Sequence, residues 1–380
     1  AMQNQALVGH VVSCGVGVGQ FVLCRNPGGN APLSEDTDVT TLERRKVGKT
    51  QLTVTEMGLG GAPMGGFRAT ISDAEAVGLT DAAYQAGVRY FDTSPFYGYG
   101  RSELRMGAGL REKPRHSYVL STKVGRVMHA RKPGEALPQE FRENGLPGFV
   151  PQFDYTYDGV MRSLEQSHLR LGLDRIDIAL VHDVDFWTIK DRKILDERFK
   201  TVMESGFRAL DELRKAGVIS AIGVGINEAD TSTRFIRAGD FDCMLLAGRY
   251  TLLEQGALEE FLPECQRRGV SVILGGPYNS GILTGNVKPG ATHDYAAAPA
   301  SLIDKAQRIE TVCARHKVPL AAAAMQFPLF HPSVCSVIPG ALSVAEVTQN
   351  QAHLGVKIPA DLWSELKREK LLDPAAPTPN

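Results

Sequence analysis

The sequence predicts an α/β fold, a (β/α)8 TIM barrel preceded by a β-hairpin, and three observations support this. From about Arg44 onward, short apolar runs alternate with longer stretches of helical periodicity, which is typical of βα units around a parallel sheet. There are eight runs and eight helical stretches, and strict alternation of this kind favours a closed barrel over an open sheet. The runs are also short and apolar on both faces, as expected of parallel strands covered on both sides.

The elements follow one another in a regular order. The segment RKVGKTQLTV predicts the hairpin, with Gly48-Lys49 at its turn. The predicted strands are residues 55–61, 88–94, 118–125, 176–183, 219–227, 241–248, 270–276 and 334–340. The predicted helices are residues 72–86, 102–111, 156–171, 205–216, 229–238, 254–268, 301–316 and an eighth that begins at Ser343. Ser72 with Glu75, and Ser343 with Glu346, have the spacing of capping boxes.

Three connections are longer than the usual two to about six residues, and all three follow the C-terminal ends of strands. They are residues 126–155 after strand 3, 184–204 after strand 4 and 277–300 after strand 7. Long loops at that end of a barrel usually build the ligand pocket, so the sequence indicates which face is functional.

The predicted barrel spans residues 44–372, between an N-terminal extension of residues 1–43 that we expect to be disordered and a flexible tail of residues 373–380. Residues 1–24 carry no charged side chain, which superficially resembles a signal peptide, but a basic first region is missing. The glycines in CGVGVGQ do not open a helix, so they are not interpreted as a dinucleotide fingerprint. No later segment approaches the roughly 20 apolar residues of a membrane span.

Composition favours a small-molecule partner. Lys and Arg number 42 against 43 Asp and Glu, so the chain has no electrostatic footprint for nucleic acid or an acidic membrane. The six cysteines are scattered without metal-ligand spacing, which suits a reducing, cytoplasmic location and argues against a structural metal. A bridge between Cys14 and Cys24 is an alternative to free thiols, and the oligomeric state is left open.

Four polar residues meet at the predicted mouth of the barrel. Asp92, Lys123 and His182 end strands 2, 3 and 4, and Tyr97 lies just after Asp92 in FDTSPFYGYGRSE. Taken singly, each has an ordinary structural interpretation: a turn cap, a snorkelling lysine, a core histidine and a packed loop tyrosine. Their joint placement at successive strand ends favours a catalytic site instead.

The set is chemically coherent. A tyrosine exchanges its proton poorly at neutral pH unless a cation favours its ionised form, and Lys123 is the candidate cation. Asp92 would keep Lys123 charged in a partly dry pocket. His182 would hydrogen-bond a substrate oxygen, while Tyr97 acts as general acid for carbonyl reduction or general base for alcohol oxidation as hydride moves to or from a cofactor.

The segments FDTSPFYG, STKVGR and DIALVHD resemble the signature segments of the aldo-keto reductase superfamily, in register over roughly residues 45–355. The resemblance implies a nicotinamide-dependent (β/α)8 barrel without a Rossmann fold. The family's catalytic tetrad of Asp, Tyr, Lys and His falls on Asp92, Tyr97, Lys123 and His182.

The resemblance also implies cofactor contacts in the loops after strands 7 and 8. They fall on Gly276, Pro277, Ser280, Gly281 and Leu283 near the pyrophosphate, and on Gly340, Ala341, Ser343, Gln349 and Asn350 near the adenosine end. Where the family has Ser-Asn on strand 5, this chain supplies only Asn227, one position late, and a bulge would restore its contact with the nicotinamide carboxamide. Ala247 replaces the usual glutamine of strand 6. Gly275 stands where an aromatic residue commonly stacks on the nicotinamide, although Tyr278 is close in sequence.

Charge indicates the cofactor. NADP-specific members place Arg or Lys after the IPG segment, but this chain has neither between Gly340 and Val356, and it has Glu346. A 2′-phosphate without a cationic partner binds poorly, so NAD is favoured, with NADP as the alternative.

Within the superfamily, GGAPMGG, GVGIN, AGRYTLLEQ and GGPYNSGIL are most similar to the branch that contains aldose 1-dehydrogenases (L-fucose or L-galactose dehydrogenases) and pyridoxal 4-dehydrogenases. This implies oxidation of an L-fucose, L-galactose or D-arabinose type of sugar to a lactone at its anomeric carbon. The alternatives are pyridoxal oxidation, broad aldehyde or ketone reduction, or a cofactor-binding regulatory or sensor subunit. Aromatic residues that are candidate walls of the substrate pocket, or else simple loop packing, are Phe67, Phe186, Trp187 and Tyr278.

Overall fold

The computed structural model describes residues 42–66, 69–135, 148–285 and 287–379. By its internal contacts the chain divides after Val39, and the described residues all belong to the second unit, which begins at Thr40. Of the expected extension, residues 1–43, only the last two lie inside the described ranges.

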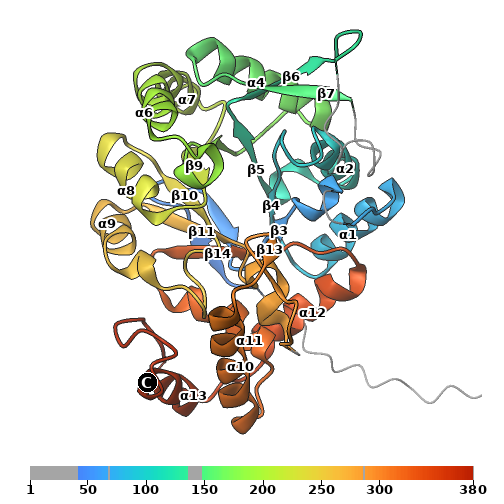
Figure 1. Ribbon diagram of the computed structural model, residues 1–380. Helices are drawn as coiled ribbons and strands as arrows, with labels where there is room; N and C mark the ends of the chain where they lie inside the picture. The colour runs from blue at the N-terminus through green and yellow to red at the C-terminus, as the bar shows by residue number, and fades with distance from the viewer. Residues whose placement is uncertain (1–41, 67–68, 136–147, 286, 380) are drawn as a thin grey trace, which may run out of the picture. The chain divides into compact units, whose positions relative to one another are not determined.

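Eight parallel strands form the predicted barrel, and Figure 1 shows them at the centre of a ring of helices. In sheet order they are β3 (Leu59–Gly60), β4 (Tyr90–Asp92), β5 (Val119–Val124), β8 (Ile178–His182), β9 (Ala221–Ile226), β10 (Cys243–Ala247), β11 (Ser271–Gly275) and β14 (Val334–Ile338). Two isolated parallel bridges, Met57 to Val337 and Gly60 to Gly340, join the first strand to the last and close the ring. The prediction of the fold class is confirmed.

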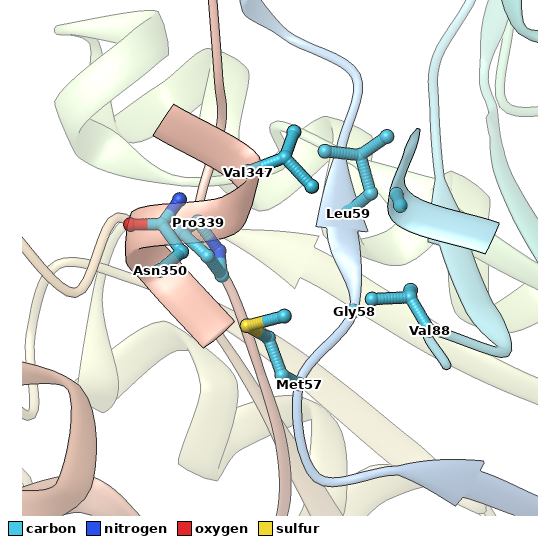
Figure 2. A pocket seen from close by; sticks show the side chains of 8 residues that line it. Met57, Gly58, Leu59, Val88, Pro339, Val347 and Asn350 are labelled. Carbon is cyan, nitrogen blue, oxygen red and sulfur yellow. The ribbon is translucent and has the colours of Figure 1, made fainter. Parts of the chain in front are cut away.

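The seam between β3 and β14 also contains a small pocket (Figure 2). Helices α1 (Asp73–Gln85) and α12 (Val344–Gly355) contribute to its wall, and its lining carries no titratable side chain. The pocket is lined by Met57, Gly58, Leu59, Ala83, Val88, Pro339, Val347 and Asn350. Its composition is that of a packing defect at the closing seam rather than of a reaction centre.

The helices confirm the predicted alternation and add elements to it. They are α1 (Asp73–Gln85), α2 (Arg101–Leu110), α4 (Tyr157–Leu171), α5 (Phe186–Ile189), α6 (Arg192–Thr201), α7 (Phe207–Lys215), α8 (Ala229–Ala238), α9 (Phe261–Arg268), α10 (Ala300–Arg315), α11 (Leu320–Gln326), α12 (Val344–Gly355) and α13 (Ala360–Arg368). Helix α11 was missed because it is buried along almost its whole length, so it shows no alternation between an apolar and a polar face. Helix α6 was missed for the opposite reason, since Leu195 is its one buried residue.

The two predicted capping boxes differ in the structure. At α1 the box is complete, because the Ser72 hydroxyl accepts the Glu75 N–H and the Glu75 carboxylate accepts the Ser72 N–H. At α12 the Ser343 hydroxyl accepts the Glu346 N–H, but the Glu346 carboxylate accepts the N–H of Leu342 instead of that of Ser343. The second capping box is therefore incomplete, because Glu346 accepts the N–H of the residue before the N-cap.

The hairpin of β1 (Arg44–Lys46) and β2 (Thr53–Thr55) closes one end of the barrel. Its buried Val47 and Val54 pack in one cluster with the first residues of several strands, such as Val119 and Ile178. Because those residues lie at the N-terminal ends of the strands, the hairpin fills that end, and the C-terminal ends remain as the mouth.

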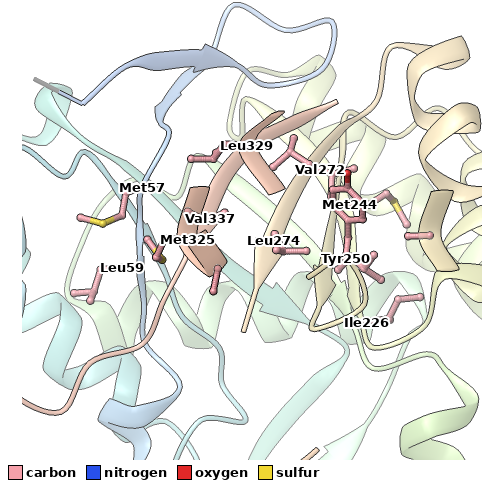
Figure 3. Packing of buried hydrophobic residues seen from close by; sticks show 14 of the residues in the cluster. Met57, Leu59, Ile226, Met244, Tyr250, Val272, Leu274, Met325, Leu329 and Val337 are labelled. Carbon is pink, nitrogen blue, oxygen red and sulfur yellow. The ribbon is translucent and has the colours of Figure 1, made fainter. Parts of the chain in front are cut away.

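A larger cluster fills the space between the strands and the helices, and Figure 3 shows part of it. Successive strand residues alternate between the two clusters: Val272 and Leu274 face the helices, whereas Ile273 faces the barrel interior. This alternation explains why both faces of the strands are apolar in the sequence.

The three long connections contain short regular elements. Residues 126–155 contain β6 (Arg126–Ala130) paired antiparallel with β7 (Phe149–Phe153), and residues 184–204 contain α5 and α6, which continue into a π-helical turn at Val202–Gly206. Residues 277–300 contain a 3₁₀ segment, Asn279–Thr284, and the pair β12 (Thr292–His293) and β13 (Ala296–Ala297). Single 3₁₀ turns also occur at Pro63–Gly65, Arg115–Ser117, Gly256–Leu258 and Phe327–Phe330.

The C-terminal segment packs against the barrel at least in part. Ala376 lies in the segment 373–380 that we expected to be a flexible tail, yet it is buried, and its carbonyl accepts a hydrogen bond of 2.7 Å from Lys367 Nζ. Within the described residues, no helix is both long enough and apolar enough to traverse a bilayer. Four cysteines in these ranges, Cys243, Cys265, Cys313 and Cys335, are buried free thiols, whereas Cys14 and Cys24 lie outside them.

Candidate active site

The structure brings the four predicted catalytic residues together at the mouth of the barrel. Asp92 and His182 are the last residues of β4 and β8, and Lys123 is the last but one of β5. Tyr97 follows in the turn between β4 and α2. Strands β4, β5 and β8 are consecutive in the sheet, which places these side chains next to one another.

Asp92 and Lys123 form a buried ion pair. Lys123 Nζ lies 2.7 Å from Asp92 Oδ2 and also donates to the Thr93 carbonyl at 2.9 Å. The other carboxylate oxygen of Asp92 accepts the Ser121 hydroxyl at 2.7 Å. Both charged side chains are at most 2% exposed. Such a pair persists in a dry environment because every charged atom has a partner, and Asp92 supplies the counter-charge beside Lys123.

Tyr97 contacts both Lys123 and His182 through its ring. Lys123 Nζ lies 4.6 Å from the ring centroid, and the Tyr97 and His182 rings meet edge to face with centroids 5.9 Å apart. Burial, and next the charge of Asp92, raise the pKa of Tyr97 well above its ordinary value, whereas Arg126 lowers it. This differs from the expectation that Lys123 lowers the pKa of Tyr97. The physical reason is first that burial disfavours the phenolate, and next that Asp92 neutralises Lys123 and itself repels a phenolate.

His182 is held by two groups that were not identified from the sequence. Its Nδ1 lies 2.8 Å from Arg126 NH1 and 3.1 Å from the Ser94 hydroxyl. Burial, and next the positive charges of Arg126 and Lys123, lower the pKa of His182 well below its ordinary value. His182 is therefore a neutral hydrogen-bonding group at neutral pH rather than a cation.

Asn227, predicted to contact the nicotinamide carboxamide, is tied to two acidic side chains. Its amide nitrogen lies 3.0 Å from Asp185 Oδ2 and 3.4 Å from Asp183 Oδ1, and its backbone N–H donates to Asp185 at 2.6 Å. Asp185 is fully buried. This network fixes Asn227 beside the end of β8, where its side chain carbonyl is the group left for a ligand amide.

The loop after β11 has the backbone conformation of a ligand cradle. Gly276, Ser280 and Gly281 have φ angles of 61°, 62° and 97°, and Asn279 has 44°. Two consecutive non-glycine residues in this region cost about 1–3 kcal/mol each, and such strain is concentrated at functional sites. The Asn279 amide donates to the Gly248 carbonyl at 3.0 Å, but its buried Oδ1 has no hydrogen-bond partner in the described part of the chain.

Helix α12 lies beside this loop, since the Tyr278 hydroxyl donates to Asn350 Oδ1 at 2.7 Å. Ser343 caps the start of the helix, where free N–H groups favour an anion, and Gln349 is exposed on its surface. Four of the predicted cofactor residues are buried. Asn350 is one of them, and the other three, Pro277, Leu283 and Ala341, would meet a ligand mainly through their backbone. Gly340 is also constrained, because an added Cβ would lie 2.4 Å from Pro63 Cγ.

Three features of this region fit a dinucleotide. They are the strained loop, the Asn279 oxygen without a hydrogen-bond partner in the described part of the chain, and the N-terminus of α12.

The candidate pocket walls are only partly brought together. Trp187 lies 6.4 Å from Tyr295, centroid to centroid, and Tyr295 was not predicted as a site residue. Phe186 is half-buried under the Arg192 guanidinium, which lies 4.4 Å from its ring. Tyr278 directs its hydroxyl to α12, as described above, and Phe67 lies outside the described residues.

A charged cluster fixes the segment that carries Tyr295. Arg249, just after β10, donates to Glu254 at 3.0 Å and to Asp294 at 2.7 Å, and His293 lies 2.8 Å from the same Glu254. Asp294 and Tyr295 both have positive φ angles, 47° and 65°, and form the two-residue turn between β12 and β13. Repulsion between the ionised forms of Tyr295 and Tyr97 contributes to the raised pKa of Tyr97, so this turn lies near Tyr97 at the mouth.

The fold and the site define a class of protein: a parallel (β/α)8 barrel with a buried ion pair, a tyrosine and a histidine at the C-terminal ends of its strands, as in a barrel oxidoreductase. Comparisons with known proteins agree. The model of the aldo/keto reductase family matches residues 56–369, and the chain belongs to this family. The protein is thus an NAD(P)-dependent dehydrogenase acting on CH–OH groups.

Two relatives and one solved structure are similar to this chain over most of its length. The chain is 44% identical over 337 residues to pyridoxal 4-dehydrogenase from Microbacterium luteolum, covering 87% of this chain and 98% of the relative. It is 39% identical over 338 residues to D-threo-aldose 1-dehydrogenase from a Pseudomonas species, covering 86% and 96%. The holo form of an aldo-keto reductase from Bacillus halodurans has a TM-score of 0.66 at 23% identity, covering 88% of this chain and 98% of that one, and this likeness shows the fold.

Proposed function

We propose that the protein is an NAD-dependent dehydrogenase that oxidises the hemiacetal carbon of a cyclic substrate to a lactone, with an aldose of the L-fucose, L-galactose or D-arabinose type as the leading candidate. The observation that carries the proposal is the buried Asp92–Lys123 pair under the ring of Tyr97, beside a neutral His182. This arrangement supplies a proton-exchanging hydroxyl and a neutral hydrogen-bonding group at one substrate oxygen.

Pyridoxal is the second candidate, and it is supported by the relative at 44% identity. Its aldehyde lies next to a hydroxymethyl group on the ring, so pyridoxal closes into a cyclic hemiacetal just as an aldose does. Both candidates therefore present the same reacting group, a CH–OH carbon bonded to a ring oxygen. Trp187 and Tyr295 are suited to cover either a sugar face or a pyridine ring.

Tyr97 and His182 would act on the hydroxyl of that carbon. In the oxidation direction, Tyr97 accepts the hydroxyl proton while the hydrogen on the carbon leaves as hydride, and a carbonyl forms. Because burial keeps Tyr97 protonated at neutral pH, it must first lose its own proton, so oxidation is favoured at alkaline pH and reduction at neutral pH. His182 hydrogen-bonds the same oxygen and orients it.

The dinucleotide, when bound, supplies the carbon that takes up or gives the hydride. Asn227 would hold its carboxamide, the strained loop at Asn279–Gly281 its pyrophosphate, and the N-terminal turn of α12 its adenosine end. The Glu346 carboxylate accepts the Leu342 N–H at 2.8 Å and places a negative charge at that turn. This charge would repel a 2′-phosphate and supports the preference for NAD.

Adding a cation beside Glu346 is expected to shift the preference toward NADP. Val344 is 50% exposed in the first turn of α12, so an arginine in Val344→Arg has room to reach a 2′-phosphate. We expect the ratio of kcat/KM for NADP to that for NAD to rise by about tenfold, the effect of one charge-assisted hydrogen bond of about 1.5 kcal/mol. The measurement is the steady-state rate with each cofactor at a fixed substrate concentration.

A matched control is Val218→Arg, because Val218 is 49% exposed but lies before β9, at the closed end of the barrel. It adds the same charge to the protein as a whole. An equal rise in the ratio for both variants, or no rise for Val344→Arg, would show that the adenosine end of the cofactor lies elsewhere.

The proposed reaction is tested by a substrate panel of L-fucose, L-galactose, D-arabinose and pyridoxal with NAD. The matched controls are the methyl glycosides of the sugars, in which the hemiacetal hydroxyl is blocked, and pyridoxal 5′-phosphate, which cannot close its ring. We expect reduced nicotinamide and a lactone from one or more hemiacetals and from none of the controls. Oxidation of pyridoxal 5′-phosphate at an equal rate would indicate aldehyde chemistry instead, and tight NAD binding without turnover of any compound would favour a sensor subunit.

A further inference from the structure

Arg126 connects two groups at the mouth of the barrel through the two ends of its guanidinium. Its NH1 lies 2.8 Å from His182 Nδ1, and its NH2 lies 2.6 Å from Asp183 Oδ2. The Arg126 side chain is 3% exposed, so water is largely excluded from both of these contacts. A forked contact of this kind fixes both partners in position as well as in charge.

The backbone turn before Arg126 directs its side chain toward the mouth of the barrel. Gly125 has a φ of 100°, and a Cβ there would lie 2.1 Å from the Tyr155 ring, so the chain turns sharply at the end of β5. The Tyr155 hydroxyl in turn donates to the His182 carbonyl at 2.7 Å. The guanidinium itself lies over two aromatic rings, 4.2 Å from the centroid of Phe96 and 4.6 Å from that of Phe153.

The chemistry of the donors determines where the His182 proton lies. A guanidinium has only N–H donors and does not deprotonate in proteins, so Nδ1 must accept from it. The Ser94 hydroxyl oxygen already accepts the Phe96 N–H at 3.0 Å, which leaves the hydroxyl proton to be donated to the same Nδ1 at 3.1 Å. With two donors directed at Nδ1, a neutral imidazole carries its proton on Nε2.

We propose that Arg126 is a positioning residue that fixes His182 as a neutral imidazole with its proton on Nε2, ready to be donated to the substrate oxygen. The assignment of the recipient oxygen rests on the proposed function, whereas the protonation state of His182 does not. Arg126 acts in two ways, by occupying Nδ1 and by neutralising Asp183.

The second action matters because Asp183 lies close to the other ring nitrogen. Asp183 Oδ1 is 3.4 Å from His182 Nε2, and an unpaired carboxylate there would draw a second proton onto the ring. The groups that face the imidazole from the elements around it are Arg126, Lys123, Asp183, Tyr97 and Ser94. Among these, only Asp183 favours the imidazolium, and Arg126 neutralises the charge of Asp183. The lowered pKa of His182 agrees with this balance.

Nitrogen-15 NMR of the protein labelled at histidine tests the proposal without substrate. The signals of His182 are assigned by their loss in His182→Gln. We expect the shifts and two-bond couplings of a neutral imidazole protonated on Nε2 at about pH 6, where an ordinary histidine is largely charged. An imidazolium at that pH, or a proton on Nδ1, would overturn the proposal whatever the substrate panel shows.

Two variants test the role of Arg126 in catalysis. In Arg126→Met, we expect His182 to become protonated at about pH 6 and kcat/KM to fall by about ten- to a hundred-fold, as when an outer partner of an imidazole is removed. In the reduction direction, which needs Tyr97 protonated, the loss should deepen on the acid side of the pH profile, where the wild type is flat. Arg126→Lys keeps the charge but cannot contact both partners, so it should recover part of the rate.

The matched control is Arg198→Met. Its guanidinium also stacks on Phe153, at 4.0 Å from the ring, and it lies 5.9 Å from the ring of Tyr155. We expect its NMR signature and pH profile to match those of the wild type. If Arg126→Met keeps both the signature and the profile, or if Arg198→Met loses them equally, Arg126 does not position His182. If Arg126→Met does not fold, the wild-type signature and Arg126→Lys still decide the question.

Discussion

Replacing Tyr97 with Phe is expected to lower kcat by about 10²- to 10⁴-fold, because it removes the hydroxyl that exchanges the proton. The ring contacts with Lys123 and His182 do not involve that hydroxyl, so the pocket should keep its shape. The dissociation constant of NAD should therefore remain nearly unchanged. Steady-state kinetics and titration of the cofactor by fluorescence measure the two quantities separately.

Tyr157→Phe is the control, since it removes a hydroxyl that donates to Glu212 at 2.7 Å away from the mouth. The pH profile adds a second readout. Because the pKa of Tyr97 is raised, the wild-type oxidation rate should increase from neutral toward alkaline pH as Tyr97 loses its proton. That increase should be absent from Tyr97→Phe. Loss of NAD binding together with turnover would mean that Tyr97 holds the cofactor rather than the proton.

Replacing Asp92 with Asn is expected to lower both stability and activity. The variant leaves the Lys123 ammonium buried without its counter-charge, and removing one partner of a buried ion pair costs about 3–5 kcal/mol of unfolding free energy. Activity should fall as well, because the carboxylate no longer fixes the lysine beneath the Tyr97 ring. Urea denaturation and steady-state rates are the measurements.

The double variant Asp92→Asn with Lys123→Met separates the two effects. With both charges removed, stability should recover in part, whereas activity should not. Lys49→Met, which breaks the exposed pair with Asp240, is the control and should change stability by less than about 1 kcal/mol. If Asp92→Asn is no less stable than Lys49→Met, the buried pair does not hold the site together.

The barrel could be predicted because its signals are local. The strands are apolar on both faces, and the start of α1 has a full capping box, so both are written in short stretches of sequence. Short elements inside the connections, such as β12 and β13, have too few residues to show a period. Their positions depend on distant contacts, such as the bond of Asp294 to Arg249.

The candidate site could likewise be predicted from the sequence only in part. Asp92, Lys123 and His182 were predicted from the rule that polar side chains at the ends of barrel strands share one mouth, and the structure places them together. The strand-end rule did not identify Arg126, because its approach to His182 depends on the positive φ of Gly125. The only available signal was its position directly after the STKVG segment.

The effect of charge on Tyr97 could not be predicted from residue types alone. The sequence suggested Lys123 as the cation that lowers the pKa of Tyr97, but in the structure burial and Asp92 raise it. Whether a lysine charge acts on its neighbour depends on what neutralises it, and this is known only when the distance of 2.7 Å from Lys123 to Asp92 is known.

The central claim is that the site transfers hydride from a hemiacetal carbon while Tyr97 takes the proton. A single-turnover experiment tests this with L-fucose and pyridoxal that carry deuterium at the hemiacetal carbon, NAD, and either the wild type or Tyr97→Phe. We predict that the wild type forms a lactone and a reduced nicotinamide that contains the deuterium, and that Tyr97→Phe forms neither within the same time. Equal transfer by both proteins, or reduced nicotinamide without deuterium, would contradict the proposed mechanism.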